Sequence, residues 1–337
     1  MKNKVVFISS SIMPLDIFLY DQIKLLSKKY DIYLITNSHN YNKKKFSGIN
    51  VITIPFSRYI NIFTDLISLI KVFLLFLNLK PLLIISITPK GGFITAMANY
   101  FINIKHLHFI TGQNWINQNG LKRVLLKFSD KFTFSHSTSM LVDSKSQIKF
   151  LKSENFKINK IKLINSGSIC GVNTNTFSPN NTFKNTERKK LEINNNHIVI
   201  LYVGRIHRDK GIYELYDVCK KLRSENFKIK LFLVGGMEDK NFSKIIDKNK
   251  SFIYYYKYNT YPQKFMQIAD IFCIPSHREG FGLSVIEASS CELPILGTNI
   301  YGLKDSISNN YTGILFKSGD SSDFYNKLKK LIIDKDL

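Results

Sequence analysis

Residues 278–287 read REGFGLSVIE, and this stretch is the most informative one in the chain. It follows an apolar run over 271–275 that predicts a buried strand ending in a turn, and it leads into the helical pattern of 285–290. A strand, a glycine-containing loop and a helix start together present backbone N–H groups to an anion. Glu279 and Glu287 lie eight positions apart around these glycines. The stretch is therefore suited to hold a phosphate on its amides and sugar hydroxyls on its carboxylates.

A second stretch, GRIHRDKG over residues 204–211, has the same order of strand, glycine, basic loop and helix. It follows the apolar run 198–203, which predicts another buried strand. Arg205 supplies a planar fork of donors suited to a diphosphate, and Lys210 supplies a compact positive charge. Each stretch alone arises easily by chance or as ordinary surface charge. Their order and separation in one chain are what predict a site for a nucleotide-sugar.

The length and charge of the chain restrict the classes of protein to consider. Its 337 residues are enough for two domains, and 44% hydrophobic with 22% charged residues indicates a globular protein. Residues 1–170 hold 23 Lys and Arg against seven Asp and Glu, so they carry +16 of the net charge of +23. The simpler interpretation of this positive surplus is a solvated basic surface that results from compositional bias. The functional interpretation is attraction to lipid headgroups, a polyprenyl diphosphate or nucleic acid.

Short apolar runs alternate with helical patterns along the chain, which is typical of βαβ units and parallel sheets. The predicted strands are 5–8, 32–36, 51–54, 82–87, 106–110, 131–135, 161–164, 198–203, 230–234, 251–254, 271–274 and 294–297. The predicted helices include 16–29, 62–79, 92–101, 121–129, 213–223, 261–269 and 323–333. So many strands overfill one sheet. We therefore expect an α/β fold with two Rossmann-like domains that face each other across a cleft.

The domain boundary is predicted near residues 165–197, which are rich in Asn, Ser and Thr and have little periodicity. We expect a first domain over 1–168, a linker region over 169–197 and a second domain over 198–337. Ligands of doubly wound sheets bind at the carboxyl ends of the strands. Both anion-binding stretches follow predicted strands of the second domain, so the nucleotide-sugar is expected there.

The most lipophilic segment covers residues 60–79. Asp65 and Lys71 interrupt it, which leaves an uncharged run over 72–79 that is too short to span a bilayer. The segment predicts a buried amphipathic helix or a helix that lies on a membrane surface. The apolar run 5–8 is too short for a signal peptide and predicts a first strand. The cysteines have no metal-ligand spacing and indicate free thiols in a reducing compartment; they are Cys170, Cys219, Cys273 and Cys291.

The chain resembles the retaining glycosyltransferases of family 4, which have the GT-B fold. The matching stretches of the second half are GVNTNTF (171–177), GRIHRDKG (204–211), LVGG (233–236), PSHREGFGLSVIEASSCELPILGT (275–298), GLKDSI (302–307) and YTGILF (311–316). In the first half, SITPKGG (86–92), HFITGQNW (108–115) and NSGSICGVNT (165–174) are similar to one bacterial branch. That branch contains the transferases of capsule, O-antigen and protein-glycan assembly.

This resemblance implies an activity and a location. Members of the branch move a sugar, often an N-acetylhexosamine, from a UDP-sugar to an acceptor linked to polyprenyl diphosphate. The first domain would bind that acceptor, and the second domain would bind the UDP-sugar. We expect a cytoplasmic enzyme that is peripheral on the inner face of the plasma membrane, with an anionic membrane surface as a partner and no nucleic acid.

The resemblance also implies a role for each site residue. Glu279 would hold hydroxyls of the donor hexose, and Glu287 would hold the ribose hydroxyls. Arg205 and Lys210 would neutralise the departing diphosphate, and one such fixed charge is worth roughly 3 kcal/mol in the transition state. Backbone groups would assist in donor binding at Gly204, Gly280, Phe281, Gly282 and Leu283. Same-face displacement, with the donor phosphate taking the acceptor proton, explains why no nucleophile–base pair is found.

On the acceptor side, Lys90 is a candidate for a phosphate contact, and Thr111 and Gly112 are candidates for shaping the sugar site. A solvated lysine and a structural turn are the simpler interpretations. The chain departs from the family where Ser9–Met13 replace a glycine-rich turn and where Thr111 replaces a histidine, with His108 shortly before it. It also ends at Leu337, so the helix with which relatives cross back to the first domain is expected to be missing.

We expect no metal and no cofactor besides the UDP-sugar co-substrate. The spacing of a metal-binding DxD motif occurs at Asp334-Lys335-Asp336, which is not next to any predicted strand. Three other functions remain open: a nucleotide-sugar epimerase or hydrolase of the same fold, an inactive truncated relative that only binds, and a nucleic-acid-binding protein. The last is motivated by charge alone, because no helix-turn-helix, RNP or zinc motif is present.

Overall fold

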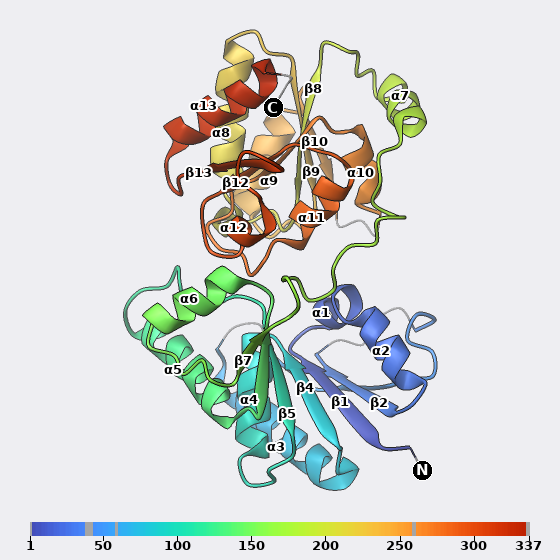
Figure 1. Cartoon of the computed structure of the whole chain (residues 1–337), viewed down its shortest axis with the longest axis vertical. Helices are drawn as coiled ribbons and strands as arrows, with labels where there is room; N and C mark the ends of the chain where they lie inside the picture. Colours follow the sequence, from blue (N-terminus) through green and yellow to red (C-terminus); the bar gives the residue numbers. More distant parts are fainter. Residues whose placement is uncertain (1, 38–42, 58–59, 258–260, 335–337) are drawn as a thin grey trace. The chain divides into compact units, whose positions relative to one another are not determined.

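The computed structural model of the chain describes residues 2–37, 43–57, 60–257 and 261–334. It divides into two compact units, Met1–Cys170 (unit 1) and Gly171–Leu337 (unit 2), and each is built on its own parallel sheet (Figure 1). This α/β architecture is the one that the alternating sequence pattern predicts. The continuous apolar strands explain it, because a parallel sheet is covered by helices on both faces.

Unit 1 contains a seven-stranded parallel sheet in the order β3-β2-β1-β4-β5-β6-β7. Its strands are β1 (Lys4–Ser9), β2 (Asp31–Thr36), β3 (Asn50–Thr53), β4 (Leu83–Ile87), β5 (His106–Ile110), β6 (Ser139–Val142) and β7 (Ile161–Leu163). Its helices are α1 (Ile12–Ile17), α2 (Tyr20–Ser27), α3 (Ile62–Leu79), α4 (Pro89–Asn99), α5 (Gly120–His136) and α6 (Lys145–Ser153).

Alternate residues of β1 divide the core of unit 1 into two layers. Val6 and Ile8 pack with side chains of α3 and α4, whereas Val5 and Phe7 pack with side chains of α1 and α2. A third cluster forms around the fully buried Trp115 and joins α5 and α6 to β5 and β6. Helices α3 and α4 therefore lie on the sheet face opposite α1 and α2.

Unit 2 contains a six-stranded parallel sheet in the order β10-β9-β8-β11-β12-β13. Its strands are β8 (Ile198–Val203), β9 (Ile229–Val234), β10 (Ile253–Tyr256), β11 (Ile271–Ile274), β12 (Ile295–Thr298) and β13 (Gly313–Phe316). Its helices are α7 (Asn181–Lys190), the 3₁₀ turn η1 (Arg208–Lys210), α8 (Ile212–Ser224), α9 (Lys240–Lys248), α10 (Gln263–Ile268), α11 (Leu283–Ser290), α12 (Leu303–Ser306) and α13 (Ser321–Ile333).

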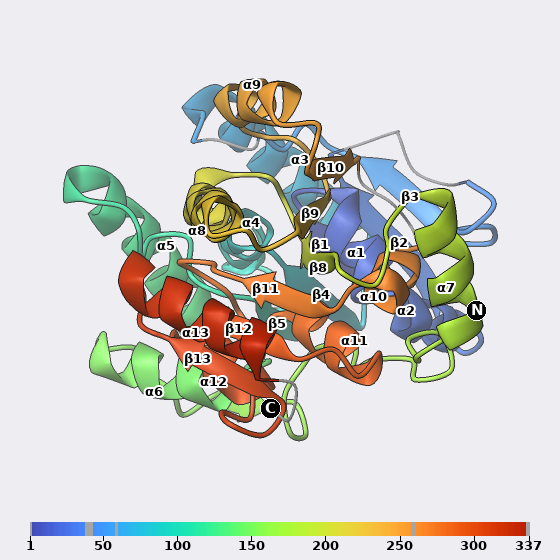
Figure 2. The same ribbon diagram turned by 90° about the horizontal axis from the view of Figure 1, so that it is seen from above.

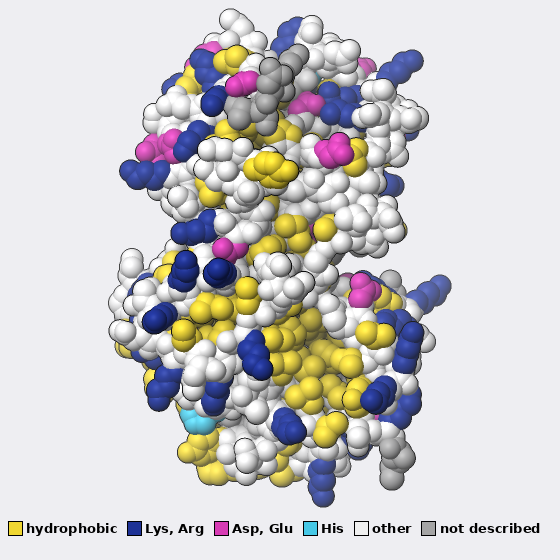
Figure 3. All heavy atoms as spheres, in the orientation of Figure 1, with side chains coloured by type: hydrophobic (Ala, Val, Ile, Leu, Met, Phe, Trp, Pro, Cys, Tyr) yellow, Lys and Arg dark blue, Asp and Glu magenta, His cyan; other side chains and the backbone are white. Residues whose placement is uncertain are grey.

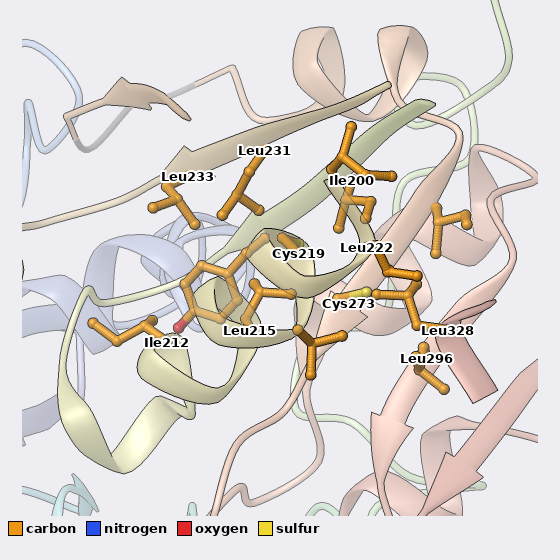
Figure 4. Close-up of a cluster of buried hydrophobic side chains, with 14 of the residues drawn as sticks. Ile200, Ile212, Leu215, Cys219, Leu222, Leu231, Leu233, Cys273, Leu296 and Leu328 are labelled. Atoms are coloured by element: carbon orange, nitrogen blue, oxygen red, sulfur yellow. The ribbon is translucent and has the colours of Figure 1, made fainter. Parts of the chain in front are cut away.

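The core of unit 2 also has two layers. Ile200 and Tyr202 of β8 pack with α8, α9 and α13, and Figure 4 shows leucines of α8 and of β9 among the side chains of this layer. Helices α8 and α13 lie side by side over it (Figure 2). Val199 and Leu201 face the other layer, with α10, α11 and α12. Free cysteines Cys219 and Cys273 are buried in the first layer, as the sequence predicts.

Two sequence predictions are wrong, and two strands, β6 and β13, were not predicted. Residues 131–135 are not a strand but the last turns of α5, because Asp130, Thr133 and Phe134 form one buried helical face. The strand of this region is β6, which the sequence analysis missed. The helix predicted over 16–29 is two helices, α1 and α2.

The linker region predicted over 169–197 is also more regular than expected, because it contains α7. Asn180 caps this helix by accepting a hydrogen bond from the N–H of Phe183 at 2.9 Å. Lys184 and Arg188 then both form ion pairs with Asp270, which precedes β11. These ion pairs attach α7 to unit 2. Because α7 has no buried residue, its sequence has no hydrophobic periodicity from which the helix could be predicted.

Candidate functional site

The site of unit 2 lies where the strand order of its sheet reverses. Strands β8 and β11 are neighbours in the sheet, although β9 and β10 separate them in the sequence. The loop 204–211 follows β8 and the loop 275–282 follows β11, so both leave the sheet at the carboxyl ends of adjacent strands. This position is the topological switch point at which doubly wound sheets bind ligands. The two stretches singled out from the sequence therefore meet in one place.

Backbone contacts hold the two loops against each other. The N–H of His277 donates to the carbonyl of Asp209 at 3.0 Å. Gly211 has φ +67°, and a Cβ atom there would lie 2.1 Å from the carbonyl oxygen of Pro275, so only glycine fits. The buried Tyr202 hydroxyl donates to the carbonyl of Arg205 at 2.9 Å and fixes the start of the first loop.

Lys210 and Glu279 form an ion pair between the two loops. The ammonium Nζ of Lys210 lies 2.6 Å from Oε1 of Glu279, and both side chains are largely buried. Ser276 donates to the same carboxylate oxygen at 2.9 Å, and Lys210 also donates to the carbonyl of Arg278 at 3.2 Å. Two of the three predicted catalytic side chains are thus in direct contact before any ligand binds.

Arg205 is held by two carboxylates. Its guanidinium lies 2.7 Å from Glu238, two residues after the LVGG stretch, and 3.2 Å from Asp209. Asp209 also accepts from Arg278 at 3.3 Å and contacts His207 at 2.6 Å. Burial opposes the ionisation of Asp209, but Arg205, Lys210 and Arg278 outweigh it and hold its pKa well below its usual range. Asp209 is therefore a stable anion that orients the surrounding cations.

The segment after Glu279 has the predicted order of loop and helix. Gly282 is the N-cap residue of α11 with φ +83°, and a Cβ atom there would lie 2.7 Å from the side chain of Leu303. Phe281 is buried beside it. Helix α11 begins at Leu283, so its first N–H groups lack a carbonyl partner four residues earlier within the helix. That of Val285 donates to the carbonyl of Gly282 at 2.9 Å. An anion contact with the amides of residues 280–283 stays a prediction.

Glu287 lies one turn after Leu283 on the same face of α11. Burial raises the pKa of its carboxyl from 4.5 to about 7. Among the described residues, no side chain donates a hydrogen bond or forms an ion pair with this carboxylate. A partly buried carboxylate without a partner is costly, so a ligand that donates hydroxyl hydrogen bonds to it would relieve that cost. This property fits the predicted contact with ribose.

We expect Glu287→Gln to stabilise the protein at alkaline pH. Because the folded-state pKa is about 7 and the ordinary value is 4.5, the folded protein binds the proton more tightly. Its stability is therefore favoured below the ordinary value and is lost as the pH rises through the folded-state value. Thermal unfolding should show a higher Tm for Glu287→Gln at about pH 8 and little change at about pH 5. The exposed Glu292→Gln is the control, and equal shifts in both variants would contradict the assignment.

The predicted acceptor-side residues lie in unit 1, near the carboxyl ends of its strands. Lys90, in the first turn of α4, forms an ion pair with Asp65 of α3 at 2.8 Å and donates to Ser57 at 2.9 Å. Its charge is thus partly neutralised within the unit. Thr88, the N-cap residue of α4, has φ +79° and accepts from the N–H groups of Ser10 and Gly91. A non-glycine residue in this region is strained, and such strain is often found at functional sites.

Thr111 and Gly112 directly follow β5, as expected. In the amide orientation that satisfies both partners, Gln147 of α6 accepts from the N–H of Gly112 at 2.9 Å and donates to Asp143 at 3.1 Å. His108 does not belong to this loop. It is buried in β5 and lies 2.7 Å from the hydroxyl of Ser86. Burial lowers the pKa of its imidazole to about 4, so His108 is a neutral structural residue at pH 7.

The sequence analysis did not assign four polar residues that complete the site of unit 2. They are Asp209, Glu238, Ser276 and Arg278. Asp209 and Arg278 are inside the two quoted stretches, so their charge was a usable signal. Glu238 could not be found from spacing, because only the fold shows that the loop after β9 reaches Arg205.

No group of three His, Cys, Asp or Glu side chains that could hold a metal ion occurs in residues 2–37, 43–57, 60–257 and 261–334. Of the Asp334-Lys335-Asp336 sequence, Lys335 and Asp336 lie outside the described residues. The expectation of a metal-independent enzyme stays a prediction.

Residues 183–337 match the family described as "Glycosyl transferases group 1". The whole chain is 32% identical to the capsular polysaccharide biosynthesis glycosyltransferase CapM of Staphylococcus aureus and covers 90% of it. Over 93% of its length, it is 27% identical to the N,N'-diacetylbacillosaminyl-diphospho-undecaprenol alpha-1,3-N-acetylgalactosaminyltransferase of Campylobacter jejuni, covering 85% of that protein. The structure of Anabaena HepE in complex with UDP and glucose is similar with a TM-score of 0.81 and 16% identity, over 99% of this chain and 91% of that one.

Two Rossmann-like units, with loops meeting at the switch point of the second, define an enzyme of the GT-B fold class. The chain belongs to the group 1 glycosyltransferase family. The predicted fold class and the predicted enzyme class are thereby confirmed. The UDP-sugar donor, the retaining mechanism and the roles of the site residues stay predictions.

Proposed function

We propose that this glycosyltransferase is a retaining, metal-independent enzyme of surface-glycan assembly. It moves a hexose or an N-acetylhexosamine from a UDP-sugar to a saccharide linked to polyprenyl diphosphate. It works as a cytoplasmic enzyme, peripheral on the inner face of the plasma membrane. The observation that carries this proposal is the pair of basic side chains, Arg205 and Lys210, held by carboxylates at the switch point of unit 2.

The names of the relatives support the choice of substrates. The Campylobacter protein is named for an acceptor linked to undecaprenol diphosphate, and the Staphylococcus protein is named for capsular polysaccharide biosynthesis. HepE has the same fold and was solved with UDP and glucose. The UDP-sugar donor is proposed by analogy with HepE, and the lipid-linked saccharide acceptor by analogy with the Campylobacter protein.

The arrangement of the site suggests how the donor is activated. Arg205 and Lys210 bind the diphosphate, and the backbone N–H groups of residues 280–283 assist them. Glu287 accepts from the ribose hydroxyls, and Glu279 accepts from hydroxyls of the hexose. The anomeric C–O bond then breaks with its electron pair going to the diphosphate, whose growing charge the two cations stabilise.

The transfer itself needs no enzyme nucleophile in this mechanism. The acceptor hydroxyl oxygen bonds to the anomeric carbon on the face that the diphosphate leaves. Its proton goes to the departing phosphate oxygen, so atoms and charges balance. Asp209 and Glu238 are anions that hold Arg205 in place, and no step requires them to exchange a proton.

The test is a titration of the protein with UDP, GDP, UDP-GlcNAc, UDP-GalNAc and UDP-Glc in the absence of metal. We expect selective binding of UDP and one UDP-sugar. Arg205→Ala should weaken that binding about 10- to 100-fold, because a charge-assisted pair of hydrogen bonds is lost. Isothermal titration calorimetry and thermal shift both measure this change.

Arg223→Ala is the matched control, because Arg223 lies at the other end of α8 and donates to the carbonyl of Ile229. It should leave UDP binding unchanged. Equal binding of UDP by Arg205→Ala and the unchanged protein would contradict the donor site. Hydrolysis or epimerisation of the bound UDP-sugar, without transfer to a lipid-linked acceptor, would favour the alternative functions.

A further inference from the structure

Helix α3 has two opposite stripes of side chains. Ser68, Val72, Phe76 and Leu79 recur at helical spacing and are buried against unit 1. The apolar residues on the other side of the helix are exposed, and the exposed fraction of Phe63 is 80%. They are Phe63, Leu66, Ile67, Ile70, Leu74 and Leu77. An exposed apolar stripe of about four turns is unusual on a soluble protein and marks an interaction surface.

The packing of α3 shows how this helix is oriented on unit 1. By length and composition it could cross a membrane, since Asp65 and Lys71 are its only charges in 18 residues. However, its buried stripe joins the same core layer as Val6 and Ile8 of β1. The ion pair of Asp65 with Lys90 of α4 holds it at a second point. The helix is therefore anchored along the surface of unit 1, with only its outer stripe free to contact a partner.

Helix α4 packs against both α3 and α5, and exposed apolar side chains occur again on α5 and at the end of α4. Leu121, Val124, Leu125 and Phe128 form an exposed stripe on α5. The same stripe leads to Phe132, whose ring lies 6.4 Å from that of Tyr100 just after α4. Phe101, which follows, is 84% exposed. We call the exposed apolar residues of α3, α5 and the α4 end the apolar face.

Positive charge surrounds the apolar face. Residues 62–136 contain eight Lys and Arg and two acidic residues. Of those two, Asp65 is paired with Lys90, and Asp130 is buried with its carboxylate bonded to the indole of Trp115. Exposed lysines flank the stripes at Lys71, Lys80, Lys105, Lys122 and Lys131. In the view of Figure 3, Lys and Arg side chains are likewise spread widely over unit 1, with few acidic ones between them.

We propose that the apolar face docks onto a lipid bilayer that carries anionic headgroups. The apolar side chains enter the boundary between headgroups and acyl chains, and the flanking lysines contact the phosphates. A second copy of the chain fits this surface less well, because a symmetric contact would bring the same basic residues together. The inference rests on the proposed function in one respect, since the bilayer is where a polyprenyl-linked acceptor resides.

The test is co-sedimentation of the whole chain with vesicles of phosphatidylcholine, with and without phosphatidylglycerol. We expect stronger binding to the anionic vesicles, and weaker binding as salt is added. The triple variant Phe63→Gln, Ile70→Gln, Leu74→Gln should bind them about tenfold or more weakly, because less apolar area is buried. All three positions are exposed, and glutamine is a good helix former, so the fold is retained.

The control variant replaces three exposed apolar residues elsewhere, with Leu25→Gln, Tyr311→Gln and Ile333→Gln. It should bind vesicles like the unchanged protein. UDP titration of every variant tests the donor site independently of the membrane contact. Weakened vesicle binding with normal UDP binding would show that the substitutions affect the apolar face and not the donor site. Equal vesicle binding by the triple variant, or none by the unchanged protein, would overturn the proposal. So would a dimer in light scattering that the triple variant dissociates, because the face would then join two copies.

Discussion

Lys210→Ala is expected to lower the turnover of the UDP-sugar by about 10²–10³-fold, the effect of removing one preorganised charge from a developing oxyanion. The ammonium of Lys210 is largely buried and lies 2.6 Å from Glu279, so its position is fixed before the donor binds. The negative charge on the diphosphate grows as the sugar–phosphate bond breaks. The loss should therefore be larger in kcat than in UDP affinity, which we expect to fall only about tenfold.

Arg208→Ala is the control for this variant, because Arg208 belongs to the same 3₁₀ turn but lies over the ring of Tyr213. It removes the same charge from the loop and should change kcat little. A double variant with Glu279→Gln adds a further check. If Lys210 and Glu279 act as one unit, the two losses are not additive. Normal turnover of Lys210→Ala would remove Lys210 from the catalytic residues.

Much of the fold was predictable because parallel strands leave a strong signal. The run Val5–Ile8 and the run Ile198–Val203 are almost continuously apolar, since both faces of each strand are covered. Residues 131–135 misled the prediction because Phe132 and Phe134 alternate with polar residues, as in a strand with one exposed face. Only the three-residue and four-residue spacing to Asp130 reveals the helix.

The orientation of α3 could not be predicted from its sequence. Thirteen of the 18 residues from Ile62 to Leu79 are apolar and lie on all sides of the helix, so hydrophobic periodicity does not distinguish the stripe that packs on the sheet from the stripe that is exposed. Of the two alternatives left open for this segment, the buried helix is found along the inner stripe, and the helix on a membrane surface stays a prediction. Its inner stripe is core, and its outer stripe is the apolar face.

The sequence predicted the two loops of the candidate site, but not the network of ion pairs that joins their side chains. The sequence placed Arg205, Lys210 and Glu279 after strands, and the order of the strands brought them together. It did not show that each cation has a carboxylate partner. Such pairings depend on which loops are neighbours, and neighbours in a sheet need not be neighbours in the chain. Glu238 on the loop after β9 is the clearest example.

Gly211→Ala is expected to destabilise unit 2 by about 2–5 kcal/mol and to weaken UDP binding. Two terms contribute. The left-handed backbone conformation costs a residue with a Cβ atom about 1–2 kcal/mol, and overpacking costs about 1–3 kcal/mol more. The overpacking arises because the Cβ atom would lie 2.1 Å from the carbonyl oxygen of Pro275 and 2.9 Å from its Cβ atom. That contact joins the two loops that carry Lys210 and Glu279, so relieving it moves them apart.

Gly319→Ala separates the backbone cost from the overpacking cost. Gly319 also has a left-handed backbone with φ +76°, but a Cβ atom there would have no other atom within 4 Å. This substitution should cost only the backbone term, about 1–2 kcal/mol, and leave UDP binding unchanged. Denaturant unfolding of both variants therefore measures the loop contact as a difference, and UDP titration measures its effect on the site. If Gly211→Ala loses no more stability than Gly319→Ala and binds UDP normally, the two loops tolerate separation. The close approach at Pro275 would then not be what positions Lys210 against Glu279.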